Sequence, residues 1–346
     1  MRALTVIPRA ANSARLDDVP EPPPRDGEVL IHAHSVGICG TDSEILAGHY
    51  GEPPGGEERL ILGHESLGRV LEAPGDSGLS PGDWVCGIVR EPDPVPCPSC
   101  ARGEWDMCQN GQYREHGINR LHGFAAERYR LDPGFVVRVD PALGERGVLL
   151  EPASVVAKAW DHIERIGARS HWTPERVLVT GAGPIGLLAA LLAVQRGFDV
   201  HVLDRVEHGP KPQLVADLGA TYHTGDVSGI GSADIVLECT GAGALVLAVM
   251  EHVRPNGIVC LTGVSSGGRR ITVDAAALNR ELVLDNNVVF GTVNANRRHY
   301  EQAAAALGRA DARWLDRLIT SRVPIAQWRD ALEKRRDDVK TVIRCA

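Results

Sequence analysis

Residues 177–186 read Val-Leu-Val-Thr-Gly-Ala-Gly-Pro-Ile-Gly, an apolar run that ends in a glycine-rich turn. The pattern Gly-x-Gly-x-x-Gly between a predicted strand and a predicted helix is typical of a dinucleotide-binding unit. Gly181 permits the tight turn, Gly183 lets a pyrophosphate approach the backbone, and Gly186 allows the helix to pack closely on the strand. The stretch therefore predicts a Rossmann-type fold.

The helix that opens at Pro184 and Ile185 offers unpaired backbone N–H groups to the phosphates of such a ligand. Asp204 ends the next apolar run, where a carboxylate binds the adenosine ribose hydroxyls and repels a 2′-phosphate. This favours NAD as the cofactor. Arg205 beside it could pair with a phosphate, so NADP remains an alternative.

The chain around this turn alternates between strands and helices. We expect strands at 176–180, 199–203, 233–239 and 257–263, and helices at 153–166, 185–196, 211–218 and 245–253. Apolar strands that alternate with helices predict a doubly wound parallel sheet, which we assign to 156–292. Thr240, Gly241 and Gly263 follow two of its strands, where they either line the nicotinamide half or form ordinary turns.

The rest of the chain is rich in short β-like runs punctuated by Gly and Pro. Examples of these runs are 1–7, 28–34, 67–72, 83–89 and 136–139. Many short strands without intervening helices indicate a β-rich, barrel-like domain. We assign 1–155 and 293–346 to it, with C-terminal helices at 298–307 and 325–334 and a strand at 341–345. A further strand, at 283–290, could form a sheet edge used for pairing between subunits.

A second motif lies within the β-rich part. Gly37-Ile38-Cys39-Gly40-Thr41-Asp42 is followed by Gly63-His64-Glu65. A thiolate, an imidazole and a carboxylate are ligands that Zn²⁺ selects. Thr41 adds a hydroxyl close to the thiolate, as the deprotonation of an alcohol beside a Lewis-acidic metal requires. The two motifs together point to a zinc-dependent alcohol or sugar dehydrogenase.

Composition supports this interpretation and excludes others. A chain of 346 residues is long enough for two domains, and a net charge of −8 disfavours nucleic acid as a partner. No apolar run reaches membrane-spanning length, and the N-terminus lacks the apolar core of a signal peptide. Eight cysteines without such a signal indicate thiols and metal sites rather than disulfides, so we expect a cytoplasmic enzyme with a small-molecule substrate.

These motifs resemble the zinc-dependent medium-chain dehydrogenase/reductase (alcohol dehydrogenase) superfamily, closest to its archaeal-type glucose dehydrogenase branch. The resemblance covers the whole chain in order. It implies a β-rich GroES-like catalytic domain, a Rossmann domain and a homodimer or homotetramer. Further segments that carry it are Glu44-Ile45, Glu115-His116-Gly117-Ile118, Leu121-His122-Gly123-Phe124 and Gly291-Thr292-Val293-Asn294.

The resemblance implies a catalytic zinc held by Cys39, His64 and Glu65, with Glu151 as a further carboxylate. Glu65 and Glu151 are expected to exchange with water as the substrate arrives, since a catalytic site keeps one position open. Asp42 is expected to orient His64 through its other ring nitrogen.

The remaining roles also follow from the resemblance. Thr41 accepts or relays the proton of the substrate hydroxyl, and Glu44 stands where other members carry a proton-relaying His. Glu115 contacts a sugar hydroxyl or a water near the metal. Asn294 is expected to contact the cofactor.

Many relatives carry a second, structural zinc bound by four cysteines. Cys97, Cys100 and Cys108 match three of them, but Pro94 occupies the position of the first. A structural site needs four protein ligands, so the site is either completed by another residue or empty. Two aspartates could complete it: Asp93 and Asp106.

The substrate pocket also departs from the branch. Polar residues that bind sugar hydroxyls align with Val89 and Val155, and an apolar wall cannot compensate the desolvation of a hydroxyl. We therefore expect a substrate other than free glucose: a modified sugar, a polyol, a cyclitol or a less polar secondary alcohol. Two alternatives stay open, namely a zinc-free NAD(P)H-dependent reductase and a non-catalytic NAD-binding protein on the same fold.

Overall fold

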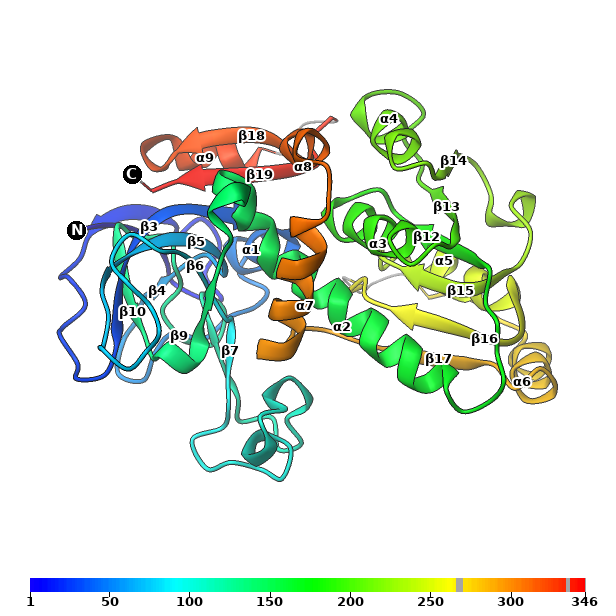
Figure 1. Ribbon diagram of the computed structural model, residues 1–346, viewed down its shortest axis with the longest axis horizontal. Helices are drawn as coiled ribbons and strands as arrows, with labels where there is room; N and C mark the ends of the chain where they lie inside the picture. Colours follow the sequence, from blue (N-terminus) through cyan, green and yellow to red (C-terminus); the bar gives the residue numbers. More distant parts are fainter. Residues whose placement is uncertain (266–269, 334–336, 346) are drawn as a thin grey trace. The chain divides into compact units, whose positions relative to one another are not determined.

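The computed structural model describes residues 1–265, 270–333 and 337–345 (Figure 1). It divides into two compact units. Unit 1 comprises Met1–Ser154 and Asn294–Ala346, and unit 2 comprises Val155–Val293. Each boundary lies one residue from the one expected from sequence. Among the described residues, no helix is long and apolar enough to cross a membrane.

Unit 2 is built on a parallel sheet, to which the described residues contribute six strands in the order β14-β13-β12-β15-β16-β17. The strands are β12 (Arg176–Thr180), β13 (Asp199–Leu203), β14 (Thr221–His223), β15 (Ala233–Glu238), β16 (Val253–Leu261) and β17 (Val288–Gly291). The helices are α2 (Leu150–Gly167, which begins in unit 1), α3 (Pro184–Val194), α4 (Pro210–Asp217), α5 (Gly243–Ala248) and α6 (Ala275–Leu284), with 3₁₀ turns η5 (Val227–Gly229) and η6 (Val249–Glu251).

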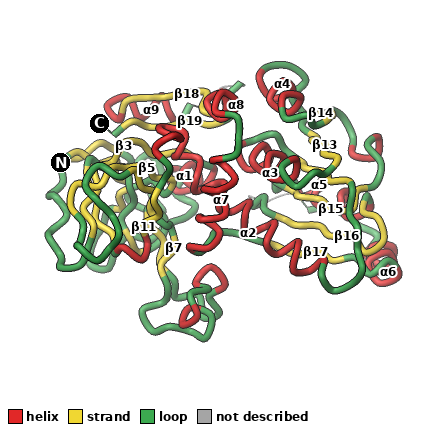
Figure 2. The backbone as a smooth tube through the Cα atoms, viewed as in Figure 1, coloured by secondary structure: helices red, strands yellow, loops and turns green. Residues whose placement is uncertain are grey.

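This sheet is the predicted doubly wound one. Every residue of β15 is buried, as expected for a strand covered on both faces, and Figure 2 shows the strands flanked by helices. The strand order reverses at β12, which is the strand that leads into the glycine-rich turn. In such sheets the reversal marks the ligand-binding crevice.

The strand expected at 283–290 was wrong over its first half. Val283 belongs to α6, and Asn286 adopts a left-handed turn with φ +53°, which asparagine tolerates. Only the second half of the run forms β17, at the edge of the sheet. The hydrophobic run therefore belongs to two different elements, because the two asparagines interrupt it.

Unit 1 is β-rich, as expected. Its described residues form a seven-stranded sheet (β11-β6-β5-β3-β19-β18, with β10 also paired to β3) and two three-stranded sheets, β2-β1-β4 and β7-β8-β9. The strands are β1 (Arg2–Val6), β2 (Arg15–Asp18), β3 (Val29–Ile38), β4 (Leu60–Ile61), β5 (Glu65–Glu72), β6 (Trp84–Gly87), β7 (Arg90–Glu91), β8 (Arg114–His116), β9 (Arg120–Leu121), β10 (Arg128–Leu131), β11 (Val136–Arg138), β18 (Ile319–Pro324) and β19 (Lys340–Arg344).

Short helices complete unit 1. They are α1 (Gly40–Leu46), α7 (Arg297–Gly308), α8 (Ala312–Leu318) and α9 (Trp328–Leu332), with 3₁₀ turns η1 (Cys100–Arg102), η2 (Trp105–Met107), η3 (Pro133–Phe135), η4 (Pro141–Leu149) and η7 (Ile325–Gln327). The helix expected at 325–334 is a 3₁₀ turn followed by α9, and Lys334 lies outside the described residues. Helix α8 and strand β18 were not expected from sequence.

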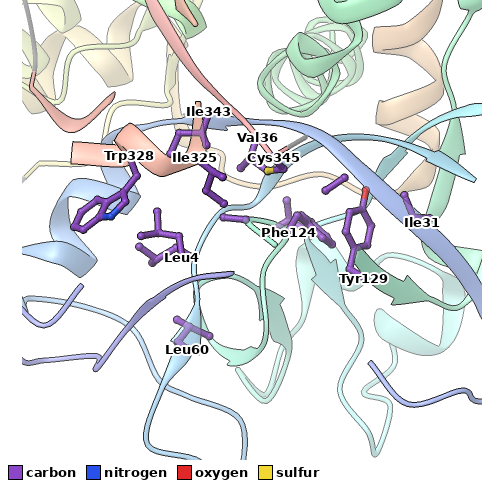
Figure 3. Close-up of a cluster of buried hydrophobic side chains, with 14 of the residues drawn as sticks. Leu4, Ile31, Val36, Leu60, Phe124, Tyr129, Ile325, Trp328, Ile343 and Cys345 are labelled. Atoms are coloured by element: carbon purple, nitrogen blue, oxygen red, sulfur yellow. The ribbon is translucent and has the colours of Figure 1, made fainter. Parts of the chain in front are cut away.

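The core of unit 1 lies between its sheets. Figure 3 shows the rings of Phe124, Tyr129 and Trp328 among aliphatic side chains from both ends of the chain, including Leu4 and Ile343. Strand β19 pairs antiparallel with β3, so the C-terminal segment completes the sheet that the N-terminal segment begins. This pairing brings residues far apart in sequence to one site.

Candidate functional site

Cys39 stands where strand β3 ends and helix α1 begins. It is the N-cap residue of α1, and its Sγ accepts a hydrogen bond from the backbone N–H of Thr41 at 3.3 Å. Asp42 completes a capping box, because its carboxylate accepts from the backbone N–H of Cys39 at 2.9 Å. The Cys-Gly-Thr-Asp sequence thus fixes the orientation of a sulfur atom by local hydrogen bonds.

His64 faces this sulfur atom. It follows Gly63, whose φ is +86° and whose added Cβ would lie 2.6 Å from Val36 Cγ1, so only glycine fits there. His64 Nε2 lies 2.9 Å from Cys39 Sγ, and Nδ1 lies 3.4 Å from Asp42 Oδ1. Burial opposes a charge on the ring, but Cys39 and Asp42 raise the pKa of His64 well above its usual value.

Glu65 completes a cluster with Cys39 and His64, in which one ligand atom from each residue lies within 4.8 Å of the others. A further residue joins it that sequence analysis missed. Lys340, at the start of β19, forms an ion pair with Glu65, and the side chains are 1% and 3% exposed. The only signal for Lys340 is the long-range register of β19 on β3, which periodicity does not reveal.

Glu151 lies in the first turn of α2 and is buried. Burial, followed by the negative charge of Glu65, raises the pKa of Glu151 to about 7. The charge of Glu65 therefore reaches Glu151, although the cluster within 4.8 Å does not include Glu151.

Thr41 and Glu44 both lie on α1. Thr41 is half-buried next to Cys39, as expected from the motif. Glu44 points to solvent and pairs with His49, with 3.0 Å between Oε2 and Nδ1 and exposed fractions of 44% and 70%. Its proposed part in a proton relay stays a prediction.

Glu115 belongs to a buried polar network in unit 1. Its Oε1 accepts from Arg90 Nε at 3.1 Å, from Arg90 Nη2 at 2.9 Å and from Asn294 Nδ2 at 2.8 Å. Asn294 has a left-handed backbone with φ +63°, and its Oδ1 accepts from the N–H of Ala295. The expected roles of Glu115 and Asn294 toward substrate and cofactor stay predictions, but the two side chains are now linked to each other.

Cys97, Cys100 and Cys108 converge in a second cluster, with their sulfur atoms within 4.8 Å of one another. The lobe that carries them, 92–113, is drawn in Figure 2 mostly as loop, with the short turns η1 and η2. Neither proposed fourth ligand belongs to this cluster among the described residues. Asp93 binds Asn110 and the N–H of Val95.

Asp106 faces away from the thiols. Its Oδ1 accepts from Asn296 Nδ2 at 2.8 Å, and its Oδ2 lies 3.9 Å from His299 Nδ1. The expectation that Asp106 could complete a four-ligand site gains no support here, because the carboxylate interacts with residues at the start of helix α7. It ties the lobe to that helix instead.

The glycine-rich turn in unit 2 has the geometry that its sequence predicts. Gly181 has φ +90°, and a Cβ at Gly186 would lie 1.7 Å from the carbonyl oxygen of Gly181. A Cβ at Gly183 would meet nothing within 4 Å, which leaves its backbone open. Pro184 is the first residue of α3 and Ile185 the second, so the helix N–H groups face this turn.

Asp204 follows β13 and is held by three donors. Its Oδ2 accepts from the N–H of Ala182 at 2.6 Å and from Lys211 Nζ at 3.1 Å, and its Oδ1 accepts from the N–H of Val206. Burial raises the pKa of Asp204, but these donors outweigh it and lower the pKa below its usual value. Lys211 was not expected from sequence, and neighbouring Arg205 adds a second positive charge.

Thr240, Gly241 and Gly263 form the loops after β15 and β16. Glu238, buried at the end of β15, accepts from the N–H groups of Thr240 at 2.8 Å and Gly241 at 3.1 Å. Thr180 Oγ1 donates to the same carboxylate at 3.2 Å. This carboxylate holds the backbone of the loop after β15, and it was not expected from sequence.

Val89 is 1% exposed and belongs to the hydrophobic core of unit 1, where its N–H donates to Tyr300 Oη at 3.3 Å. Val155 is half-buried. Val89 therefore packs in the interior and contributes less to a substrate wall than its alignment suggests.

Comparison with known families agrees with this fold and with these motifs. Residues 25–141 match the alcohol dehydrogenase GroES-like domain, and residues 144–345 match the glucose dehydrogenase C-terminus. A GroES-like domain joined to a doubly wound sheet defines the medium-chain dehydrogenase class, as expected from sequence. Within this class, the chain belongs to the glucose dehydrogenase family.

Individual relatives support this membership. The chain is 40% identical over 350 residues to glucose 1-dehydrogenase 2 of Vulcanisaeta moutnovskia, and 37% identical over 355 residues to glucose 1-dehydrogenase of Methanocella arvoryzae, each covering 99% of both chains. Haloferax mediterranei glucose dehydrogenase, solved in complex with NADP, Zn and gluconolactone, has a TM-score of 0.92 and 32% identity, over 100% of this chain and 99% of that one.

Proposed function

We propose that the chain is a zinc-dependent oxidoreductase that transfers a hydride between NAD(P) and a sugar, polyol, cyclitol or related secondary alcohol. The carrying observation is the cluster of Cys39, His64 and Glu65 in a chain that also holds a dinucleotide turn on a parallel sheet. The relatives named glucose 1-dehydrogenase support the same reaction class.

The donor set fits zinc. A sulfur, an imidazole nitrogen and a carboxylate oxygen are its preferred ligands, and their atoms already lie within 4.8 Å of one another. Cys39, His64 and Glu65 would hold the ion, with Glu151 as a further carboxylate. When bound, zinc supplies a Lewis acid that lowers the pKa of a substrate hydroxyl, while NAD(P) accepts the hydride.

The residues around the cluster orient it and move the proton. Asp42 stands 3.4 Å from His64 Nδ1 and so supports the tautomer that leaves Nε2 free for a metal. Thr41 relays the proton of the substrate hydroxyl, because its hydroxyl group accepts that proton while it gives up its own. Glu44, on the same helix as Thr41, is paired with His49 and offers an exposed carboxylate that would take the proton toward solvent.

NAD binds at the turn formed by Gly181, Gly183 and Gly186, with its pyrophosphate at the N-terminus of α3. Asp204 is the acceptor for the ribose hydroxyls. Because Lys211 neutralises much of its charge, repulsion of a 2′-phosphate is weakened, and NADP is accepted as well. Loss of Lys211 in Lys211→Met should therefore shift the kcat/KM ratio toward NAD⁺ by about tenfold, the effect of roughly 1.4 kcal/mol.

Lys158→Met is the matched control for this cofactor test. Lys158 is likewise a largely buried lysine of unit 2, and its Nζ donates to the carbonyl of Val293 at 3.1 Å. Its loss should leave the ratio between the two cofactors unchanged. An unchanged ratio in Lys211→Met would contradict the assignment of Lys211.

Substrate selection rests on Glu115, whose carboxylate suits hydroxyl groups, while Asn294, which donates to that carboxylate, would contact the cofactor. Val155 supports a substrate less hydroxylated than free glucose, whereas Val89 carries little weight because it lies in the core. A panel of aldoses, polyols, cyclitols and simple secondary alcohols, assayed with NAD⁺ and NADP⁺, tests both points. High turnover of D-glucose at low KM would contradict the substrate proposal while leaving the reaction class intact.

The two alternatives are less well supported. A zinc-free reductase does not require a cluster of thiolate, imidazole and carboxylate. A non-catalytic NAD-binding protein does not require such a cluster either. The eight cysteines are all unpaired, which favours a reducing compartment, and we propose the cytoplasm.

We also propose that the chain forms homodimers or homotetramers through the edge of unit 2. Strand β17 ends the sheet, and the residues near it include exposed apolar side chains. These are Val283, Leu284 and Val293. An unpaired edge with apolar neighbours fits a second copy of the same edge. Val283→Glu with Leu284→Glu should give monomers by light scattering, whereas an unchanged mass would contradict this interface.

A further inference from the structure

Lys340 is a buried cation next to the candidate metal ligands. Its side chain is 1% exposed, and its Nζ donates to the carbonyl oxygen of Ile38 at 3.0 Å as well as pairing with Glu65. Inside the protein, the side chain is thus the cationic partner of the Glu65 carboxylate.

The fold makes room for this ion pair at one residue. Glu65 lies opposite Gly37 in the β3–β5 pairing, and Gly37 lies opposite Val342 in the β3–β19 pairing. A Cβ at Gly37 would lie 2.0 Å from Glu65 Oε2 and 2.8 Å from Lys340 Cε. A side chain at position 37 would therefore collide with the ion pair, and glycine leaves room for it.

Stability alone does not account for this arrangement. Replacing a buried ion pair with apolar side chains often leaves the stability of a protein unchanged or increases it. A buried lysine is therefore not needed for stability. Here the ammonium group pairs with Glu65, which is also a candidate metal ligand. Once a divalent ion binds, two cations compete for one carboxylate.

We propose that Lys340 is a positioning residue that shares the Glu65 carboxylate with the bound zinc, and so keeps Glu65 a weak, displaceable ligand. The inference rests on the proposed function, since it presupposes zinc at Cys39 and His64. When the substrate needs the ligand position, Glu65 keeps Lys340 as its partner and is never left as an unpaired buried charge. Lys340 also repels the metal, so its charge lowers zinc affinity.

The test is the zinc affinity of Lys340→Met, measured by chelator competition on the metal-depleted full chain. We expect zinc to bind at least about tenfold more tightly than in the wild type, because a repelling charge is removed and Glu65 is left to the metal. Cys39→Ser identifies which binding event belongs to this cluster rather than to the three-cysteine lobe. Lys158→Met, which removes a buried lysine from unit 2, should leave zinc affinity unchanged.

If Lys340→Met does not fold, a second comparison, between Glu65→Gln and the double variant Glu65→Gln with Lys340→Met, still tests the proposal. Glu65→Gln leaves the ammonium group beside the metal without its carboxylate, so zinc should bind more weakly than in the wild type. Glu65→Gln with Lys340→Met replaces the ion pair with neutral side chains of similar size. This double variant should bind zinc at least about tenfold more tightly than Glu65→Gln alone.

Kinetics give a second readout. In Lys340→Met, the substrate must displace a carboxylate that has no other partner, so KM for the alcohol should rise about tenfold or more while the Kd of the nucleotide stays unchanged. The proposal would be overturned if zinc affinity fell or did not change in Lys340→Met relative to the wild type and in the double variant relative to Glu65→Gln. Lys340 would then serve only to hold Glu65 in place. Failure of the wild type itself to bind zinc at Cys39 would instead refute the proposed function.

Discussion

The two cysteine clusters of unit 1 differ in what surrounds the sulfur atoms. The cluster at Cys39 combines one thiol with an imidazole, a carboxylate and the buried ammonium group of Lys340. The cluster in the lobe holds three thiols, Cys97, Cys100 and Cys108, and its nearby carboxylates bind other partners. The cluster at Cys39 contains a further charged group, Lys340, that is not a metal ligand. The cluster in the lobe has three ligands, one fewer than a structural zinc site needs.

This difference separates two uses of a metal. A catalytic site needs ligands that can give way to a substrate, whereas a structural site needs four that do not. The exchangeable carboxylates and the competing cation of the first cluster suit catalysis. The three thiols of the second suit structural binding only if a fourth ligand comes from outside them, so we expect loss of any metal there to leave the activity intact.

The largest effect is expected from Cys39→Ser. Losing the thiolate should remove the zinc of this cluster and lower kcat/KM on the order of a thousandfold or more, while binding of NAD(P) to unit 2 persists. Cys345→Ala, in the core of the same unit, should retain activity. Activity that survives Cys39→Ser would break the distinction between the clusters, and nucleotide titration by fluorescence checks that the fold is intact.

A smaller effect is expected from Cys100→Ser in the lobe. Thermal unfolding should begin at a lower temperature, with Tm falling by ~2–4 °C for each kcal/mol lost, while kcat stays within a few-fold of the wild type. Calorimetry and steady-state kinetics on the same preparation measure both. A thousandfold loss of kcat would show instead that the lobe takes part in the chemistry.

Asp106→Ala tests how the lobe is attached to helix α7. The substitution removes the acceptor of Asn296 Nδ2, a buried group, and should destabilise the protein by about 1–3 kcal/mol in urea unfolding. Zinc content should not change, because Asp106 is not a ligand. Loss of one zinc per chain would contradict its assignment to α7.

The smallest effect concerns thiol reactivity in the metal-free protein. Hydrogen bonds from the backbone N–H groups of Gln109 and Cys100 lower the pKa of Cys97, whereas burial raises the pKa of Cys86. The thiolate is the nucleophile, so below pH 8 Cys97 should be alkylated by iodoacetamide before Cys86. Peptide mapping after a brief exposure gives the order, and equal labelling of the two would refute it.

Sequence predicted the parts that depend on local pattern. The strand–turn–helix at Gly181 is encoded within a few residues, so its geometry follows from a short motif. The capping box at Cys39 is equally local, although it was not predicted. Lys340 and Lys211 were missed because each acts through a contact set by strand register or helix placement, which no spacing in the chain reveals. Glu238 was missed although its contacts with Thr240 and Gly241 are local; its contact with Thr180 depends on the pairing of β12 and β15.

The errors have the same origin. The run at 283–290 has apolar residues at both ends, which suggested one strand, yet a left-handed Asn286 divides it between α6 and β17. Asp106 lies between two cysteines in sequence, but its side chain is directed by Asn296 on a distant helix. In both cases, neighbours along the chain suggested a structure that local backbone conformation or a distant partner then decided differently.

Restoring zinc to the metal-depleted enzyme while following reduction of NAD(P)⁺ tests the central claim most directly. We predict that activity returns in proportion to zinc bound at Cys39, His64 and Glu65, that Cys100→Ser recovers activity with a single equivalent, and that Cys39→Ser recovers none. Full activity in the metal-depleted wild type, or recovery in Cys39→Ser, would contradict a catalytic zinc at this cluster.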